Sequence, residues 1–495
     1  MTAGTIKQTS TTSKNGYESE LNNWINQEKA AIELISIIGS LWFEKSVELI
    51  IFHHELTDRS TSELMNLHLY AQNIVKQPIA IHDTLLIARE IQKLEMSPSR
   101  IDIGKLASEW ILEKPKYDND STKFITDKLK GFIGKDKLVL KPKDVVLYGF
   151  GRIGRIATRE LISQAGKGEQ LRLRAIVTRS YSDADLVKRA DLLRTDSVHG
   201  PFPGTVVEDF ENKALIINGH TVKMIASSKF EDVDYTSYGI NDALLIDNTG
   251  VVRDREGLGK HLLAKGISKV LLTAPGKGDI PNIVFGVNHE KFDIKKEKIF
   301  SAASCTTNGI IPVLKVIDEA LNIKSGHMET IHSYTNDQNL LDNYHKKYRR
   351  GRSAPLNMVI TETGASSAVG KVLPNLKGKL TANSVRVPTP NVSLAILHLE
   401  IDKKTTREAV NEIMRQAALH SELVEQIQYS YSNELVSSDV IGNPCPSVFD
   451  SQATIVAENG NQIVLYVWYD NEYGYTKQVF RLAKYLAEVI RLRYY

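Results

Sequence analysis

Cysteine is scarce in this sequence, whose 495 residues include only Cys305 and Cys445. Two thiols argue against a disulfide framework or a cysteine-rich zinc site, we expect no metal site, and such cysteine usage is typical of the reducing cytoplasm. Long apolar runs are also missing, because no stretch approaches the roughly 18 residues of a membrane-spanning helix. The polar N-terminus lacks the apolar core of a secretory signal. These absences predict a cytoplasmic protein that is neither exported nor membrane-bound.

A large excess of charge of one sign is missing as well. The 62 Lys and Arg residues nearly balance the 59 Asp and Glu residues, which leaves a formal net charge of +3. This balance gives no basis for binding to nucleic acid or to a membrane surface. The chain is longer than one hydrophobic core usually supports, so two or three domains are expected.

The first part of the chain has helical periodicity but no recognisable chemistry. Residues 1 to about 16 are polar and are predicted to be disordered. Between about 18 and 113, apolar residues recur at intervals of three and four, which predicts an all-α unit of four or five helices. Ser60-x-x-Glu63 has the pattern of a capping box, and Asp83 and Asp102 are expected to cap two later helices.

A dinucleotide-binding fingerprint opens the second part of the chain. The apolar strand predicted at 144–148 runs into Gly149-Phe150-Gly151-Arg152-Ile153-Gly154 and then into a helix. In a GxGxxG sequence between strand and helix, the first glycine permits a tight turn and the second lets a pyrophosphate approach the backbone. The third lets the helix pack on the strand, and the helix N-terminus faces the phosphates. This context predicts a Rossmann domain that binds NAD or NADP.

The end of the next predicted strand, 171–177, bears on the choice of coenzyme. An NAD-binding fold normally has an acidic residue there for the ribose hydroxyls, whereas this chain has Thr178-Arg179-Ser180. Arg179 would suit the 2′-phosphate of NADP. Alternatively, Arg179 faces solvent, and Asp183 or Asp185 holds the ribose. Both interpretations stay open, and the first is slightly favoured.

The octapeptide 301–308 places a cysteine where a predicted strand gives way to a helix. Free N–H groups and the positive end of the helix dipole favour a thiolate, which is the nucleophilic form. A lone cysteine is more often a small buried apolar residue, but the polar neighbours of Cys305 favour a nucleophile. A β-branched run farther along ends at His332. We interpret His332 as the base that activates Cys305.

From about residue 144 to the end, the sequence resembles a phosphorylating glyceraldehyde-3-phosphate dehydrogenase. Eight collinear segments carry the resemblance: GFGRIGR at 149–155, DSVHG at 196–200, ASCTTN at 303–308, HSYTNDQ at 332–338, TGASSAVGKVLP at 363–374, VRVPTPNVS at 385–393, VSSDVIGNP at 436–444 and WYDNEYGY at 468–475. The resemblance implies an α/β fold with a Rossmann dinucleotide-binding domain at 144–304 and an α/β catalytic domain on a mixed or antiparallel sheet at 305–468. An all-α N-terminal extension with its linker, 1–143, would precede them. A C-terminal helix within 469–495 would return to the Rossmann domain, and the assembly would be a homotetramer.

The resemblance also implies a reaction of glycolysis and gluconeogenesis. Cys305 would attack the aldehyde carbon of glyceraldehyde 3-phosphate with His332 as general base, and the hemithioacetal would pass hydride to NAD(P), leaving a thioester. Inorganic phosphate would then release 1,3-bisphosphoglycerate. The implied phosphate-binding residues are Thr335 with Arg386 at one site, and Ser304, Thr306 and Thr363 with Gly364 at the other. The implied coenzyme-binding residues are Gly149, Gly151, Arg152, Ile153, Gly154, Arg179, Thr249, Thr273, Tyr475 and Asn471, the last orienting the nicotinamide carboxamide.

Several positions depart from the family pattern. Tyr148 replaces the usual asparagine before the glycines, Gly309 replaces a second cysteine, and Thr178-Arg179 replaces an Asn-Asp pair. The last change predicts that NADP is accepted at least as well as by typical NAD enzymes. Two alternatives are an erythrose-4-phosphate dehydrogenase, which hydrolyses its thioester, and a non-catalytic binding or regulatory protein on the same scaffold. The retained YTNDQ and TGA segments argue against the first, and the retained Cys305 and His332 against the second.

Overall fold

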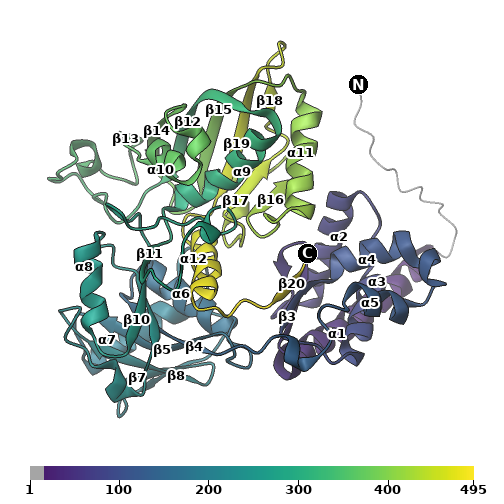
Figure 1. Cartoon of the computed structure of the whole chain (residues 1–495), viewed down its shortest axis with the longest axis horizontal. Coiled ribbons are helices and arrows are strands. Elements are labelled where there is room, and N and C mark those ends of the chain that lie inside the picture. Colours follow the sequence, from purple (N-terminus) through teal and green to yellow (C-terminus); the bar gives the residue numbers. More distant parts are fainter. Residues whose placement is uncertain (1–15) are drawn as a thin grey trace. The chain divides into compact units, whose positions relative to one another are not determined.

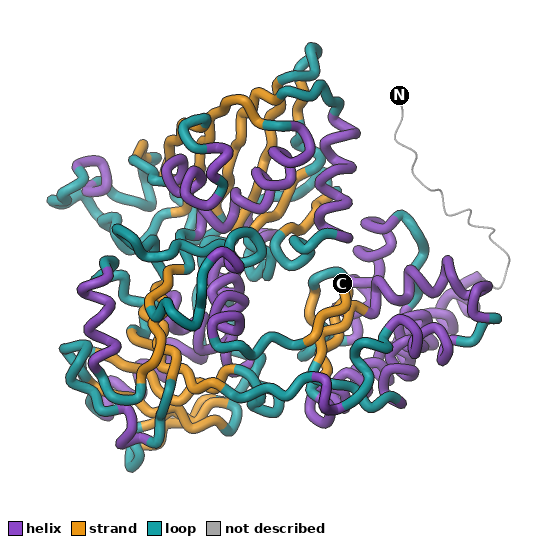
Figure 2. The backbone as a smooth tube through the Cα atoms, in the orientation of Figure 1, coloured by secondary structure: helices purple, strands orange, loops and turns teal. Residues whose placement is uncertain are grey.

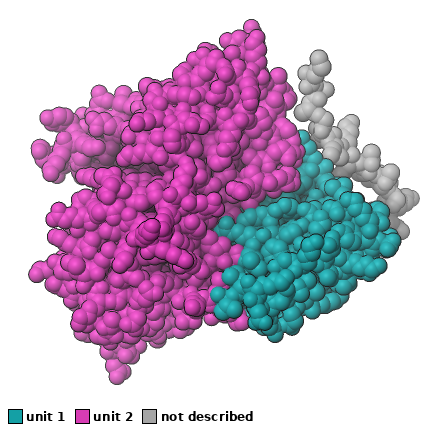
Figure 3. All heavy atoms as spheres, in the orientation of Figure 1, with its two compact units in different colours: residues 1–139, 492–495 teal, residues 140–491 magenta. Residues whose placement is uncertain are grey.

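The structure, a computed structural model, describes residues 16–495. The disorder predicted for the first residues concerns a segment outside the described part. The chain forms two compact units, coloured separately in Figure 3: one comprises residues up to 139 together with 492–495, and the other comprises residues 140–491. The chain therefore passes from one unit to the other twice, after residue 139 and after residue 491.

The N-terminal unit combines helices with a small sheet. Its elements are α1 (Gly16–Lys45), β1 (Val47–Ile51), β2 (His54–Glu55), α2 (Thr61–Val75), α3 (Ile81–Lys93), β3 (Ser99–Asp102), α4 (Ile103–Glu113), α5 (Ser121–Lys128) and β20 (Leu492–Tyr494) (Figure 1). The strands pair in the order β2-β1-β3-β20. The capping box at Ser60 is confirmed, and Asp102 caps α4 by accepting a backbone N–H at 3.0 Å. Asp83 is not the N-cap residue of α3, which begins at Ile81; it lies in the first turn, where its carboxylate accepts the N–H of the N-cap residue Ala80 at 2.8 Å.

The prediction of an all-α extension is corrected by the strands that lie among its helices. β1 is short, buried at every position and apolar except for Glu48, a pattern that periodicity alone does not distinguish from a buried helical segment. β3 is also fully buried although three of its four residues are polar, and Arg100 pairs with Glu48 of β1 at 2.7 Å. The other neighbour of β3 is β20, from the far end of the sequence. No local pattern could therefore reveal β3.

The second unit confirms the predicted Rossmann organisation. Its first sheet has the strand order β11-β10-β9-β4-β5-β8-β7-β6. The elements of this part are β4 (Lys143–Tyr148), α6 (Arg152–Ser163), β5 (Leu171–Thr178), α7 (Asp183–Arg194), β6 (Val206–Asp209), β7 (Ala214–Ile217), β8 (His220–Ala226), β9 (Ala243–Asp247), α8 (Arg255–Gly259), β10 (Ile267–Leu272) and β11 (Ile299–Ser301). The strands from β11 to β8 are parallel, and β6, β7 and β8 form an antiparallel meander at the edge. Apolar side chains such as Leu147, Ile176 and Ile246 are buried in its core.

The second sheet of this unit is mixed, with the order β13-β14-β12-β15-β19-β17-β16 and β18 beside β19. Figure 2 shows the strands of the chain in orange and the helices that pack beside them in purple. Its strands and helices are α9 (Cys305–Leu321), β12 (Ile323–Ser333), β13 (Val359–Thr361), α10 (Ala365–Val372), β14 (Leu380–Val387), β15 (Ser393–Ile401), α11 (Arg407–His420), β16 (Ile427–Ser430), β17 (Ser447–Asp450), β18 (Ile455–Val456) and β19 (Gln462–Tyr469). β12 is parallel to β14 and antiparallel to β15. Apolar residues of α9, among them Leu314 and Ile317, share a buried cluster with Leu397 and Leu465 of this sheet. The prediction of a mixed or antiparallel sheet is therefore confirmed as mixed.

Helix α12 (Tyr473–Leu486) follows β19 and belongs to the Rossmann core. Its Val479 and Phe480 share an apolar cluster with Val145 and Leu147 of β4. The helix is shorter than the segment 469–495 in which it was expected, since residues 492–494 form β20.

Among residues 16–495, no helix combines the length and the apolar character that crossing a bilayer requires. Within the same described range, no three or more His, Cys, Asp or Glu side chains gather as they would around a metal ion.

Candidate active site

The carboxyl ends of the parallel Rossmann strands meet at one edge of the sheet. Tyr148 of β4 pairs with Asp247 of β9, Asp247 pairs with Leu272 of β10, and Leu272 pairs with Ser301 of β11. The chain therefore leaves these strands at a common level. This register brings the glycine fingerprint and the segment leading to Cys305 to one edge, which is where an open α/β sheet binds its ligand.

The glycine fingerprint forms a cradle that side chains would fill. Gly149 has a φ of 98°, and a Cβ there would lie 2.9 Å from Cγ2 of Thr249. A Cβ on Gly154 would lie 2.3 Å from the carbonyl oxygen of Gly149, so only glycine lets α6 approach the strand this closely. At Gly151 a Cβ would meet nothing within 4 Å, which leaves open space before the first N–H groups of α6. Asp247 holds Thr249 in place by accepting its N–H at 2.7 Å and its hydroxyl at 2.6 Å. The residues present fit the pyrophosphate of NAD or NADP.

Cys305 is the first residue of α9 and follows a strained turn. Ala303 has a φ of 56°, a left-handed conformation that costs a non-glycine residue about 1 kcal/mol. The hydroxyl of Tyr475 donates to the Ala303 carbonyl at 3.0 Å and holds this turn. Ser304 caps α9, its hydroxyl accepting the N–H of Thr307 at 3.0 Å. The cysteine thus lies at a helix N-terminus, as the sequence predicts.

The sulfur of Cys305 lies 3.6 Å from Nε2 of His332. Nδ1 of His332 lies 2.8 Å from the carbonyl oxygen of Ser333, so we assign the proton of the neutral ring to Nδ1 and the lone pair to Nε2. Burial, reinforced by the positive charge of Arg386, lowers the pKa of His332 to about 3. The imidazole is therefore neutral near neutral pH, and Nε2 can accept the thiol proton.

The prediction that the helix N-terminus favours a thiolate at Cys305 needs correction. Burial raises the pKa of the Cys305 thiol, and this effect outweighs the opposing effects of the Arg386 charge and of the N–H groups in the first turn of α9. The helix N-terminus therefore does not by itself produce a thiolate. The sulfur needs a base to become a nucleophile, which gives the contact with His332 its chemical significance.

Ser333, fully buried at the end of β12, connects the residues around His332. Its carbonyl oxygen also accepts from Nη1 of Arg386 at 2.9 Å. Its hydroxyl donates to Oδ1 of Asn471 at 2.9 Å, and the hydroxyl of Ser393 donates to the same oxygen at 3.0 Å. Two donors on Oδ1 orient the amide of Asn471 and leave Nδ2 to donate to a ligand. Sequence reasoning missed both serines, and for Ser333 the one available signal was its position next to His332.

Arg386 lies behind the cysteine–histidine pair. Its Nη1 donates to Oγ1 of Thr335 at 3.1 Å and lies 3.2 Å from Nδ1 of His332. Its Nε is buried and has no hydrogen-bond partner in the described structure. A partly buried guanidinium with a donor to spare next to a hydroxyl is suited to holding an anion. Asp337 accepts the Thr335 hydroxyl and pairs with Arg350, which fixes this side of the site.

A cavity of about 570 Å³ brings together much of the predicted site. Its lining includes the predicted residues Cys305, His332, Ser304, Thr335, Arg152, Ile153, Thr273, Asn471 and Tyr475. Thr306 is buried beside Cys305, and its hydroxyl lies 3.0 Å from that of Tyr469. Thr363 and Gly364 do not line this cavity. They lie instead at the start of α10, where Thr363 accepts the N–H of Ala365 at 3.2 Å.

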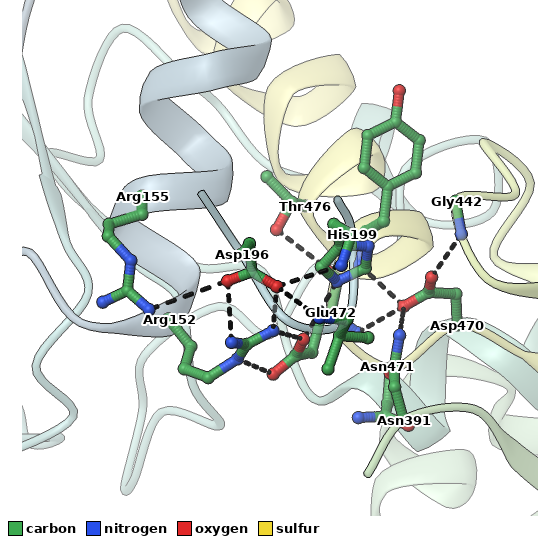
Figure 4. A network of polar contacts seen from close by, with 12 residues as sticks. Arg152, Arg155, Asp196, His199, Asn391, Gly442, Asp470, Asn471, Glu472 and Thr476 are labelled. Carbon is green, nitrogen blue, oxygen red and sulfur yellow. Dashed lines mark hydrogen bonds and ion pairs between the residues drawn. The ribbon is translucent and has the colours of Figure 1, made fainter. Parts of the chain in front are cut away.

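Figure 4 shows that Arg152 is held between two carboxylates. Its Nη1 and Nη2 donate to Asp196 at 2.8 and 3.1 Å, and its Nε and Nη2 donate to Glu472 at 2.6 and 2.5 Å. Burial alone would raise the pKa of Asp196, but hydrogen bonds from the His199 N–H and from Arg152 hold that pKa well below its usual range. With its guanidinium paired to two carboxylates, Arg152 presents no unpaired charge to the cavity that it lines. The network explains the DSVHG and WYDNEYGY segments, for which the sequence alone gave only partial roles.

A second cavity, of about 410 Å³, lies at the carboxyl ends of β4 and β5. Its lining includes the predicted residues Gly149, Gly151, Arg179 and Thr249, together with Tyr148, Phe230 and Arg189. None of the described residues that line this cavity is acidic. The hydroxyl of Ser180 donates to Asp185, and that of Tyr181 to Asp183, each at 3.3 Å, and neither aspartate lines the cavity. Arg189 of α7 lines the same cavity as Arg179, and sequence reasoning missed it.

Comparisons with known proteins agree with this geometry. Residues 143–255 match the family description "Glyceraldehyde 3-phosphate dehydrogenase, NAD binding domain", and residues 304–471 match "Glyceraldehyde 3-phosphate dehydrogenase, C-terminal domain". A glyceraldehyde-3-phosphate dehydrogenase-like protein of Pseudomonas aeruginosa is 50% identical over 459 residues, covering 92% of this chain and 98% of the relative. The glyceraldehyde-3-phosphate dehydrogenase of Priestia megaterium is 42% identical over 339 residues, 68% of this chain and 96% of the relative. The chloroplastic glyceraldehyde-3-phosphate dehydrogenase A of Zea mays is 44% identical over 341 residues, 68% of this chain and 81% of the relative. The chain therefore belongs to the glyceraldehyde 3-phosphate dehydrogenase family, and its coenzyme is NAD or NADP.

Proposed function

We propose that this chain converts glyceraldehyde 3-phosphate and inorganic phosphate to 1,3-bisphosphoglycerate with reduction of NAD(P). The observation that carries the proposal is the 3.6 Å contact between the Cys305 sulfur and Nε2 of His332 in a cavity that Asn471 also lines. A thiol whose pKa is raised by burial needs this neighbouring base, and the neutral imidazole supplies it.

In the first step Nε2 of His332 takes the thiol proton while the sulfur of Cys305 bonds to the aldehyde carbon, and the proton passes to the aldehyde oxygen. The product is a hemithioacetal on Cys305. Bound NAD(P) supplies the hydride acceptor. As the carbon is oxidised, His332 takes the hydroxyl proton, and a thioester remains on Cys305. A phosphate oxygen then bonds to the thioester carbon, the carbon–sulfur bond breaks, and the acyl phosphate leaves while the sulfur regains a proton.

We propose two anion sites around Cys305. Arg386 with Thr335 forms one, supported by the 3.1 Å bond between them and by the unpaired donor on Nε of Arg386. Ser304 and Thr306 with Thr363 and Gly364 form the other. Its support is the position of these residues at the N-termini of α9 and α10, where backbone N–H groups lack intrahelical partners.

We propose that NADP is accepted at least as well as by typical NAD enzymes of the family. Arg179 and Arg189 both line the second cavity, from which the described lining residues provide no carboxylate for a ribose 2′-hydroxyl. Two guanidinium groups favour a 2′-phosphate through charge-assisted hydrogen bonds. The alternative role for Asp183 or Asp185 has no support, since neither lines the cavity. Steady-state kinetics with both coenzymes test this, and a large preference for NAD would reject it.

The limits of the domains and the assembly are also proposals. The extension would end near 143, the Rossmann domain near 304 and the catalytic domain near 468, in keeping with the ranges of the two family matches. We infer a homotetramer from family membership alone, and light scattering of the purified chain measures it directly.

The experiment that tests the reaction is the phosphate dependence of NAD(P)H formation. With glyceraldehyde 3-phosphate, turnover is expected to require inorganic phosphate and to stop after iodoacetamide modification of Cys305. Turnover without phosphate, and with erythrose 4-phosphate preferred, would assign the chain to the hydrolysing sister enzyme. An unreactive Cys305 and no coenzyme reduction would indicate a binding protein on this scaffold.

A further inference from the structure

The N-terminal unit ends its sheet with a strand from the other end of the sequence. β20 pairs in parallel with β3, with Leu492 opposite Ser99, Arg493 opposite Arg100 and Tyr494 opposite Ile101. The N–H of Leu492 also donates to the carbonyl of Pro98 at 3.1 Å. Figure 1 shows β20 beside β3. Without β20, one side of a buried strand would present unpaired backbone groups, which is the setting in which proteins add a strand from a peptide.

Tyr494 of β20 is half-buried and makes several side-chain contacts within the N-terminal unit. Its hydroxyl donates to Oε2 of Glu109 in α4 at 2.6 Å. The ammonium group of Lys105, one turn earlier in α4, lies 5.5 Å from the centre of its ring. Phe132 meets the same ring edge-to-face, with the ring centres 6.0 Å apart. Three kinds of contact therefore converge on one aromatic residue: a charge-assisted hydrogen bond, a cation–π contact and an aromatic pair.

Glu109 and Lys105 each make a further contact. Glu109 also pairs with Lys128 of α5 at 3.0 Å, and Lys105 also donates to the backbone oxygen of Tyr495. Burial and the Glu109 hydrogen bond raise the pKa of Tyr494, so its hydroxyl keeps its proton and remains a donor. The receiving groups thus lie on α4 and at Phe132, shortly after α5, all in the first part of the sequence, and only the strand comes from elsewhere.

β20 lies close in the sequence to α12, the last helix of the second unit. Five residues, 487–491, separate it from the end of α12 at Leu486. This short segment is itself held in the dehydrogenase unit, where Val489 is fully buried and its carbonyl accepts the amide of Gln170 at 2.5 Å. The N-terminus of α12, at Tyr473, follows closely after Asn471, which lines the larger cavity.

We propose that the N-terminal unit is a binding site for strand 492–494 of this same chain, with Tyr494 as the recognised side chain. Its role is to hold the segment that follows α12 by strand addition. The extension is then neither a second catalytic centre nor an inert leader, but a receptor whose ligand is strand 492–494, which folds as part of the N-terminal unit. The site would accept the same strand as a separate peptide, because register and side-chain contacts, and not the covalent link, define it.

Hydrogen exchange of the backbone amides at 99–102 tests this proposal. The full chain is compared with a chain that ends at Arg491, alone and with a synthetic peptide of residues 487–495. We expect exchange at 99–102 to become at least roughly tenfold faster on truncation. The peptide should restore slow exchange in a saturable way, while a scrambled peptide of the same composition should not. Unchanged exchange after truncation would overturn the proposal, and so would a loss that the peptide does not reverse.

A pair of full-length variants keeps the test decisive if the truncated chain does not fold. Tyr494→Ala removes every contact of the ring and should speed exchange at 99–102, whereas Tyr494→Phe loses only the hydrogen bond to Glu109 and should have a smaller effect. Equal exchange in Tyr494→Ala and the unmodified chain would contradict recognition through Tyr494.

Discussion

The two cavities of the dehydrogenase unit are built in different ways. Around the larger one, the groups that would do chemistry are fixed by hydrogen bonds: His332 to Ser333, Asn471 to two serines, and the turn before Cys305 to Tyr475. Around the smaller one, Arg179 is exposed and Tyr148 replaces an asparagine of the family pattern. We therefore expect the proposed reaction to depend on this hydrogen-bond network, and the choice of coenzyme to depend on a few side chains of the smaller cavity. Substitutions in the first cavity should therefore abolish turnover, and those in the second should redirect it.

Removing the nucleophile should have the largest effect. Cys305→Ser is expected to lower turnover by at least about 10³-fold, because a hydroxyl beside a neutral imidazole is a much weaker nucleophile than a thiol. Coenzyme reduction by the purified variant measures this. Cys445→Ala is the matched control, since Cys445 is the other cysteine of the sequence and does not line the cavity. Turnover by Cys305→Ser comparable to that of the unmodified chain would contradict the role of Cys305 as the nucleophile.

Removing the base should come next. His332→Asn is expected to reduce turnover by about 10²- to 10⁴-fold, the usual contribution of a positioned general base. In the unmodified chain the pKa of His332 is lowered to about 3, so the base is neutral above that pH and is lost only as the pH falls toward 3. A turnover–pH profile that loses its low-pH limb in the variant would support this. A profile unaffected by the substitution would contradict it.

The charge of Arg386, behind the Cys305–His332 pair, should affect both substrate binding and the pKa of the Cys305 thiol. Arg386→Gln is expected to raise the KM for glyceraldehyde 3-phosphate by about ten- to a hundredfold, the value of one or two charge-assisted hydrogen bonds. Because the Arg386 charge lowers the pKa of Cys305, its loss should also move the pH dependence of iodoacetamide labelling to higher pH. Arg386→Lys keeps the charge and should shift that profile less.

In the second cavity, Arg179→Asp should change the preference between NADP and NAD without lowering turnover. The ratio of kcat/KM for NADP to that for NAD is expected to fall by about tenfold or more, through loss of attraction and added repulsion of the 2′-phosphate. Lys188→Ala, an exposed neighbour on α7 that does not line the cavity, is the control for general charge. An unchanged ratio in Arg179→Asp would mean that Arg179 does not approach the coenzyme.

Substitutions in the hydrogen-bond network around Asn471 should have the smallest effect. Ser333→Ala removes one of the two donors on Oδ1 of Asn471 and should raise the KM for coenzyme by about three- to tenfold, the value of a single buried hydrogen bond. Ser393→Ala should act similarly, and the double variant should exceed the sum of the two changes in binding free energy, because the amide is then free to turn. Additive effects would argue that the serines do not act through a shared amide.

Local sequence patterns predicted those parts of the site that depend on neighbours along the chain. The glycine cradle and the Cys305 helix start each lie within a few residues of the strand that precedes them, so their spacing is visible in the sequence. The bond from Ser333 to Asn471 spans 138 residues and leaves no local trace. The raised pKa of Cys305 was missed because burial is the sum of packing from several elements, whereas the helix N-terminus is a local feature. β3 was missed for the same reason, since its partner β20 lies at the other end of the sequence.

A single-turnover experiment tests the central claim most directly. The unmodified chain is mixed with glyceraldehyde 3-phosphate and NAD(P) without inorganic phosphate, and coenzyme reduction is followed alongside the intact mass of the protein. We expect a burst of about one reduced coenzyme per active site, a mass increase that maps to an acyl group on Cys305, and continued turnover only after phosphate is added. Sustained turnover without phosphate, or a burst of equal size from Cys305→Ser, would contradict it.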